Sequence, residues 1–226
     1  MGFALSVLLL GCESAVDPDA DVSWSGWVYV DQDPEQVLTG GTVDFWVDGW
    51  SGAVAASEPY AEDYGGFWEV LLPPAVAVNV RVAQAGGRPT WWAGDVPSTR
   101  ANWFGGALFA GSDAWLAMAF SSLGEDDEAW LSAAAEGVLV FGYPANDGLL
   151  CGDLLVGVPA APEAPLCWVV DESGVLRVGE AADPVSWFAA MAEPGEVVVN
   201  VAGATEVWTA EAGEVILPWY LFGGGS

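Results

Sequence analysis

The sequence contains neither histidine nor lysine, and only four arginines stand against 32 aspartates and glutamates. The formal net charge at pH 7 is therefore −28. Nucleic acid is excluded as a partner because phosphate binding draws on clustered cations, and these arginines are scattered: Arg81, Arg88, Arg100 and Arg177. The lack of histidine also excludes Ser-His-Asp and Cys-His catalytic devices and histidine-ligated metal sites.

Apolar residues are abundant despite this charge. Hydrophobic residues make up 53% of the 226 positions, and tryptophan alone occurs 14 times. A high net charge is typical of disorder when apolar residues are scarce, but this chain has enough apolar surface to bury a core. We therefore expect a folded protein with two domains of about 100 residues each.

The N-terminus resembles the lipobox of bacterial lipoproteins. Residues 3–10 are all apolar or small, and the run ends in Leu9-Leu10-Gly11-Cys12. The resemblance implies that residues 1–11 are a signal peptide and that Cys12 carries the lipid. No lysine or arginine precedes the run, which departs from the usual pattern, and a simple secretory signal is the alternative. A membrane span is excluded by length, since it needs about 20 apolar residues.

A polar tether is expected at residues 12–22, where no apolar periodicity is present. Asp17, Asp19 and Asp21 have the spacing that opens a calcium loop, but Val22 stands where such a loop needs glycine. We therefore interpret this segment as a solvated tether rather than a metal site.

Cys151 and Cys167 are the two cysteines besides Cys12. An exported protein folds in an oxidising compartment, so these two are expected to form a structural disulfide. Closing a loop of about 16 residues would stabilise the fold by roughly 3 kcal/mol.

Alternating side chains predict half-buried strands. Val76, Val78, Val80 and Val82 point to one side, and the residues between them point to the other. Glycine and proline pairs separate such segments along the chain, as in Gly65-Gly66 and Pro73-Pro74. Several short strands with regular turn signals indicate a β-sandwich.

The sequence also repeats itself. Phe67 aligns with Phe188, Pro73 with Pro194, and the segment 76–80 with 197–201. The second copy has additional residues between Val158 and Phe188, and Cys167 falls among them. The shared order of strand segments and turn residues indicates an internal duplication. The disulfide would then hold the inserted residues against the rest of the second copy.

Residues 24–31, 38–43 and 66–74 resemble the carboxypeptidase regulatory-like domain, a transthyretin-like β-sandwich. The resemblance covers residues 23–87 well and 136–221 more loosely. It departs at Ala75, where the family usually has glycine. It implies a mainly β protein with two transthyretin-like or Ig-like β-sandwiches in tandem, at residues 23–97 and 136–222, and it carries over no catalytic residue.

A short helical connector is predicted at residues 98–135 between the two sandwiches. Residues 113–122 and 125–135 are rich in alanine, and Ser112 can cap the first helix. A glycine-rich tail, 223–226, follows the second sandwich.

Tryptophan and carboxylates are the residues that leave a binding or catalytic role open. Trp91 and Trp92 are adjacent and face opposite ways in a strand, so we expect one of them to be exposed for ligand binding. Closely spaced carboxylates such as Glu62-Asp63 could bind a divalent cation. Two carboxylates at a set separation could serve a glycosidase, but with 32 acids such a pair also arises by chance.

We therefore expect a lipid-anchored envelope protein with a structural, adhesive or interaction role, without enzymatic activity, cofactor or metal. The expected location is the bacterial cell envelope, as an outer-membrane lipoprotein facing the periplasm or the surface. Its expected partners are the membrane, through the anchor, and an envelope protein or polysaccharide. The alternatives are a carbohydrate-binding module with exposed tryptophan, which needs a row of solvent-facing rings on one sheet face, and a glycosidase-like enzyme.

Overall fold

The computed structural model describes residues 22–30, 33–37, 42–47, 55–57, 67–74, 76–83, 86–95, 103–104, 108–142, 148–201 and 204–218. The predicted signal peptide, the lipid-bearing Cys12 and the glycine-rich tail lie outside these residues. The same holds for the tether apart from Val22, and for the Glu62-Asp63 pair.

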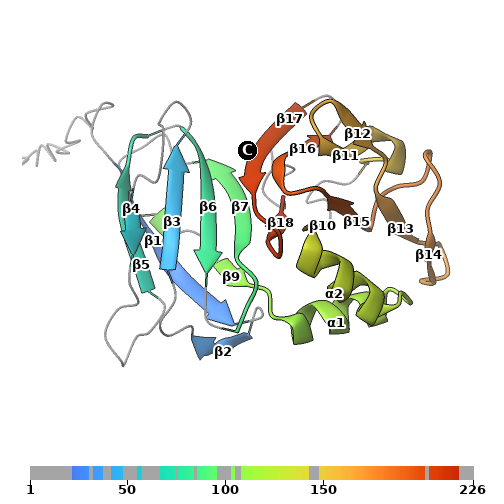
Figure 1. The fold of residues 1–226 in the computed structure, drawn as a ribbon, viewed down its shortest axis with the longest axis horizontal. Coiled ribbons are helices and arrows are strands. Elements are labelled where there is room, and N and C mark those ends of the chain that lie inside the picture. The colour runs from blue at the N-terminus through green and yellow to red at the C-terminus, as the bar shows by residue number, and fades with distance from the viewer. Residues whose placement is uncertain are drawn as a thin grey trace, which may run out of the picture.

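The described part is mainly β (Figure 1). The N-terminal half contains β1 (Val22–Val30), β2 (Asp33–Val37), β3 (Thr42–Val47), β4 (Ala55–Ser57), β5 (Phe67–Leu72), β6 (Ala77–Ala83), β7 (Thr90–Asp95), β8 (Trp103–Phe104) and β9 (Leu108–Ala110). Two helices follow, α1 (Asp113–Ser122) and α2 (Asp127–Glu136). The C-terminal half contains β10 (Val138–Gly142), the 3-10 helix η1 (Cys151–Asp153), β11 (Leu154–Val158), β12 (Ala161–Glu163), β13 (Leu166–Val170), β14 (Leu176–Val178), β15 (Trp187–Ala192), β16 (Gly195–Val201), β17 (Ala204–Ala210) and β18 (Val215–Leu217).

Both predicted helices are present. The Ser112 hydroxyl accepts a hydrogen bond from the Trp115 N–H at 3.1 Å, as its capping role requires. The second helix begins later than predicted because Asp126 is its cap and accepts from the Ala129 N–H. The predicted connector is only partly helical: β8 and β9 precede the helices and pair in parallel with β1, and the side chains of Leu108 and Ala110 in β9 are buried.

The alternation in the valine-rich strand is confirmed. Val78, Val80 and Val82 of β6 are buried, whereas Asn79 and Arg81 between them are half-buried on the other face. The same alternation holds in β3, where Val43 and Phe45 are buried. The aliphatic positions therefore form one side of a sandwich core.

The two halves contain the same set of strand pairings. In the first half β3 pairs with β4 and β6, β6 pairs with β7, and β1 pairs with β5 and, in parallel, with β9. In the second half β11 pairs with β12 and β16, β16 pairs with β17, and β10 pairs with β15 and, in parallel, with β18. The predicted repeat segments 76–80 and 197–201 lie on β6 and β16, which have equivalent places in this scheme.

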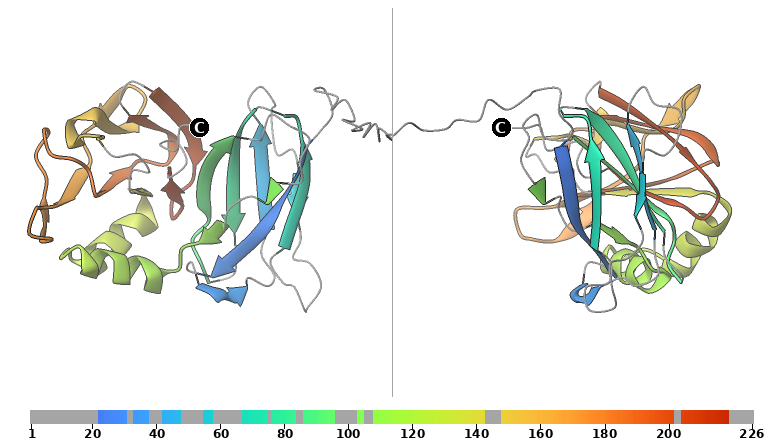
Figure 2. Two further views of the ribbon diagram at one scale, coloured as in Figure 1. Left: turned by 180° about the vertical axis from the view of Figure 1, so that it is seen from behind. Right: turned by 90° about the vertical axis from the view of Figure 1, so that its left-hand side faces the viewer.

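One sheet passes through both halves. It has nine strands in the order β14-β13-β15-β10-β18-β7-β6-β3-β4, and the two halves meet where β18 pairs in parallel with β7. A five-stranded sheet around β1 and a four-stranded sheet, β12-β11-β16-β17, complete the sandwich layers (Figure 2). Because β18 pairs with β7, the strand pairing continues from one half into the other and marks no boundary between two domains. The predicted boundaries of the tandem domains therefore stay a prediction.

The nine-stranded sheet is covered differently along its length. One core cluster combines side chains of the first sandwich with those of α1, α2 and the second half, including Val28, Phe45, Phe120 and Phe141. The other lies between the second half of this sheet and the four-stranded sheet. One face of the long sheet is thus covered by the β1 sheet and then by helices, and the opposite face is covered by the four-stranded sheet in the second half.

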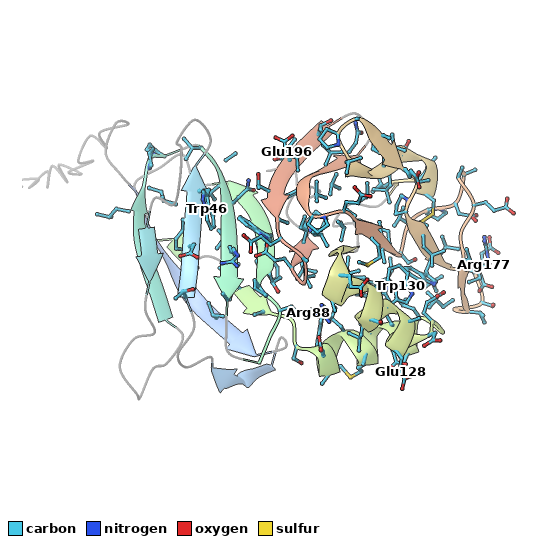
Figure 3. All side chains as sticks on the ribbon, viewed as in Figure 1. Trp46, Arg88, Glu128, Trp130, Arg177 and Glu196 are labelled. Carbon is cyan, nitrogen blue, oxygen red and sulfur yellow. A yellow bond between two sulfur atoms is a disulfide. The ribbon has the colours of Figure 1, made fainter. Side chains whose placement is uncertain are left out.

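Arg88 joins the first half to the helices (Figure 3). Its guanidinium donates to the carbonyl oxygens of Ala134 at 2.8 Å and Leu131 at 3.1 Å, and it pairs with Asp113. These carbonyls belong to the last turns of α2, which has no basic residue of its own there. The Ala134 carbonyl is among the last four of α2, which have no partner within a helix, so the arginine satisfies this acceptor and places a positive charge near the C-terminal end of α2.

Candidate functional site

Trp91 and Trp92 are both buried, so the expectation that one of them is exposed is wrong. Trp92 is 1% exposed and belongs to the cluster that combines the first sandwich with the helices and part of the second half, whereas Trp91 is 8% exposed and belongs to the cluster under the four-stranded sheet. The two rings do face opposite sides, as neighbours in a strand must. Both faces of the sheet are covered at β7, because Trp92 packs in one core cluster and Trp91 packs with Trp208 of β17 in the other.

A buried carboxylate occupies the junction between the halves. The side chain of Glu214 is 4% exposed and receives two hydrogen bonds from Arg81, from Nε at 2.9 Å and from Nη2 at 2.7 Å. Its second oxygen accepts from Trp91 Nε1 at 2.6 Å and from the Glu211 N–H at 3.0 Å. All of these donors satisfy a charge that would otherwise be costly to bury.

The turn between β17 and β18 places this carboxylate. The Glu214 N–H donates to the Glu211 carbonyl at 3.2 Å, and the Gly213 N–H donates to the Gly137 carbonyl at 2.9 Å. Gly213 has a φ of +87°, in the left-handed region where glycine is favoured. The tight turn therefore fixes Glu214 immediately before β18 enters the long sheet.

A groove of about 490 Å³ lies beside this ion pair, and we name it the junction groove. One wall comes from β3, β6 and β7, and the other from β17 and the turn after it. The lining residues are Trp46, Asn79, Arg81, Trp91, Val207, Trp208, Thr209, Glu211 and Glu214. Its volume is in the range of ordinary ligand sites.

The first-half wall of the junction groove is formed by half-buried side chains. Trp46 lies 4.7 Å from Trp91 between ring centroids, at an angle of 41°, and Figure 3 shows Trp46 on β3. Arg81 lies over the Trp91 ring at 6.0 Å from its centroid, and Asp44 is 3.8 Å from Arg81. We call this surface, made of Asp44, Trp46, Asn79 and Arg81, the open face. It continues the sheet face that the four-stranded sheet covers farther along.

This arrangement could recognise a ligand through the ring of Trp46, the side-chain amide of Asn79 and the backbone edge of β17. Glu214 is already paired with Arg81, and Glu211 beside it is exposed. In the part of the chain that the structure describes, no group of three or more His, Cys, Asp or Glu is placed to hold a metal ion. The groove presents Trp46, Asn79 and the residues of β17 beside the Arg81–Glu214 pair.

The other tryptophans whose side chains the structure describes do not form a row of exposed rings. Trp115, Trp168 and Trp208 are buried. Trp130 is half-buried and stacks on Phe120 at 4.7 Å, and Trp187 is half-buried and stacks on Phe141 at 5.5 Å. The half-buried rings come from β3, α2 and β15, so the tryptophans whose side chains the structure describes do not form the flat aromatic platform that the carbohydrate-binding alternative requires.

The predicted disulfide is confirmed. Cys151 in η1 and Cys167 in β13 are joined, with Cα atoms 6.0 Å apart. The additional residues of the second half form the hairpin β13–β14, which extends the nine-stranded sheet beyond β15. Gly179 follows this hairpin, and a side chain there would lie 2.8 Å from the Cys151 sulfur. The bridge thus ties the inserted hairpin to the start of β11.

Replacing both cysteines of this bridge by alanine should lower the free energy of unfolding by about 3 kcal/mol, because the unfolded chain regains the entropy of a closed loop. Urea denaturation measures the loss. A reducing agent should destabilise the native protein to the same extent and leave the double variant unchanged. An unchanged midpoint on reduction of the native chain would contradict the stabilising role.

Another ion pair involves Arg177 of the inserted hairpin, at the end of the molecule away from Trp46 (Figure 3). Arg177 donates to both oxygens of Asp183, at 2.8 and 2.9 Å, and the Glu180 N–H donates to one of them at 2.8 Å. These bonds lower the pKa of Asp183 to about 2, chiefly through Arg177. The pKa of Asp171 is also lowered, chiefly by the Ser173 hydroxyl.

Replacing Arg177 by glutamine should raise the pKa of Asp183 toward the ordinary aspartate value of about 4. In the native protein, the ionised carboxylate stabilises the hairpin above that ordinary value, and this contribution is lost as the pH falls through about 2. NMR titration of the side-chain carboxyl carbons tests this. Asp171 is the internal control, since its main donor is Ser173, and its pKa should change little. An Asp183 pKa that also stays low would contradict the assignment of the cause.

Comparisons with known proteins show only distant likeness. No family model and no curated protein matches the chain. Among solved structures it is similar to the TIE protein of Bacillus anthracis, with 8% identity and a TM-score of 0.32 over 88% of this chain; the chain spans 34% of that protein. It is also similar to a protein of Bacteroides thetaiotaomicron whose suggested role is cell adhesion, with 12% identity, a TM-score of 0.21, and coverage of 89% of this chain and 95% of that one.

The chain's described helices are all too short or too polar to cross a membrane.

Sequence reasoning found the disulfide and named Trp91, but it missed Arg81, Glu214 and Trp46. The sequence held one signal for Arg81. It is one of only four cations, and it stands on the polar side of a strand in which valine alternates with other residues. Nothing in the sequence distinguishes Glu214 from the other acids.

Proposed function

We infer that the chain is a non-enzymatic interaction module of the bacterial cell envelope, held to the membrane by lipid on Cys12, with a structural or adhesive role. The observation that supports it most is the joint in the nine-stranded sheet, where β18 pairs with β10 on one side and β7 on the other. Strand pairing and the Arg81–Glu214 ion pair hold the halves together, which suits a protein that projects a surface away from a membrane.

Charge and the disulfide support the same proposal. A net charge of −28 keeps an anchored protein soluble and limits self-association through repulsion. The Cys151–Cys167 bridge is typical of oxidising compartments, such as the periplasm or the cell surface. The proposed location is the outer membrane, with a lipoprotein signal and carboxypeptidase regulatory-like sandwiches as the resemblances imply.

The described carboxylates support a role without catalysis. A glycosidase needs two carboxyl groups roughly 5 to 10 Å apart, one of them with a raised pKa. Glu214, the buried acid of the described residues, is held by Arg81. The described carboxyl groups whose pKa clearly departs from its ordinary value, Asp171 and Asp183, are shifted downward.

Fatty-acid labelling tests the anchor. The full chain, expressed in a bacterium fed an alkyne-tagged fatty acid, should carry the tag and fractionate with membranes. Replacing Cys12 by alanine should abolish both, while Cys151 and Cys167 remain as an internal control for labelling of other thiols. A full chain that is unlabelled and released as a free protein would overturn the anchored role.

Cell adherence tests the role itself. Cells that display the full chain should be retained several-fold better than cells with the Cys12→Ala variant on a surface coated with their own envelope fraction. Equal retention of the two strains, with equal amounts of protein produced, would overturn the adhesive role and leave the anchor to be judged by labelling alone.

A further inference from the structure

Among the strands at the edges of the nine-stranded and the four-stranded sheets, β17 is the longest. These sheets end at β4, β14, β12 and β17. The first three have three residues each, and β12 contains Pro162, whereas β17 has seven residues. Short strands, proline and bulges are the usual protections of a sheet edge against pairing with other chains. β17 pairs with β16 in one continuous register, and its described residues include neither a proline nor a bulge; Glu206 is its one charged residue.

The junction groove runs beside this edge. Val207, Trp208 and Thr209 are consecutive in β17, and all three line the groove. Successive side chains of a strand point to opposite faces, so a cavity lined by three in a row lies along the strand's edge. Val207 is 46% exposed, and Thr209 is exposed as well.

The four-stranded sheet ends at β17, and the open face lies just beyond it. A further strand added next to β17 would cover this face. Trp208 of β17 and Trp91 of β7 belong to one core cluster, so β17 is the last strand that covers this face of the long sheet. Beyond it, Trp46, Asn79 and Arg81 line the groove half-buried. A strand added to β17 would extend the cover over these side chains.

We propose that β17 accepts an extended, basic peptide segment of a partner protein as an additional strand in the junction groove. Main-chain hydrogen bonds to β17 would give affinity, and an apolar side chain against Trp46 would give selectivity. The charge of −28 repels a second copy of this chain and any acidic segment, and it attracts a basic one. The proposal rests on the proposed interaction role and names the class of partner.

Amide hydrogen exchange on the full chain tests strand addition. The probe is a peptide as long as β17, in which lysine alternates with valine and phenylalanine. At about ten times its dissociation constant, it should slow the exchange of alternate β17 amides by about tenfold. A peptide of equal charge with a central proline should bind more weakly and protect less, because proline cannot donate to a ladder. Unchanged exchange in β17 at saturation would overturn the proposal.

A matched pair of variants separates edge pairing from plain charge attraction. Val207→Lys on β17 and Val178→Lys on β14 place the same charge on an exposed valine of an edge strand, with exposures of 46% and 55%. Val207→Lys should weaken peptide binding several-fold more than Val178→Lys, while denaturation midpoints of the two stay close. Equal weakening by both variants would overturn the proposal.

Two other occupants give distinguishable results. Protection of β17 that grows with protein concentration and no peptide would assign the edge to a second copy, and protection by neutral oligosaccharides alone would assign the groove to sugars; either result overturns the proposal. The peptide experiment is carried out in solution. If the peptide does not bind, the labelling and adherence results still stand. If the chain is not anchored or does not mediate adherence, the peptide result still stands.

Discussion

Replacing Arg81 by methionine should lower the free energy of unfolding by about 3 to 5 kcal/mol, the range for breaking a buried ion pair by removal of one partner. The Glu214 side chain is 4% exposed, and without Arg81 it keeps only the Trp91 Nε1 and Glu211 N–H donors. Its charge would remain buried without a countercharge. Urea denaturation, followed by tryptophan fluorescence and by circular dichroism, measures the loss.

The double variant Arg81→Met with Glu214→Gln is the control. Glutamine keeps an oxygen that can accept from Trp91 and removes the charge, so the double variant should be clearly more stable than Arg81→Met alone. A loss in the double variant equal to or larger than that of the single variant would mean that packing of the Arg81 stem, rather than charge, holds the junction. Arg88→Met offers a second comparison, since that guanidinium contacts α2 carbonyls and has no buried acid as its partner.

Local patterns in the sequence predicted local structure well. The alternation in β6, the Ser112 cap and the two helices rest on contacts within a few residues, and the structure confirms them. The disulfide followed from having only two cysteines besides the lipobox residue. The internal repeat was visible because strand order and turn residues repeat together, and the strand pairings of the two halves agree with it.

The junction could not be predicted, because its contacts join residues far apart in the chain. β7 and β18 pair in parallel, with Trp91 opposite Ile216, and neither strand has a sequence feature that selects the other. Arg81 and Glu214 are 133 residues apart. The expectation that Trp91 or Trp92 is exposed assumed a sheet with one covered face. The pairing of β7 with β18 places both residues in a sheet that is covered on both faces at this point.

Replacing Trp92 by alanine should lower the free energy of unfolding by about 3 to 5 kcal/mol, and replacing Trp91 by alanine should cost about as much. Each change leaves a cavity, that of Trp92 in the cluster shared by the first sandwich and the helices and that of Trp91 in the cluster under the four-stranded sheet. Trp91→Ala also removes the Nε1 donor that lies 2.6 Å from Glu214. Denaturation midpoints of the two variants are the measurement.

The half-buried Trp46 on the same sheet is the matched control, because its ring covers Trp91 from the open face and fills no closed core. Trp46→Ala should therefore cost less than either neighbour on β7. If the sheet had one covered face at this point, one of the two adjacent tryptophans would tolerate alanine as easily as Trp46 does. Tolerance at Trp91 would mean that β17 does not pack over β7, which would contradict the core cluster that these two strands share.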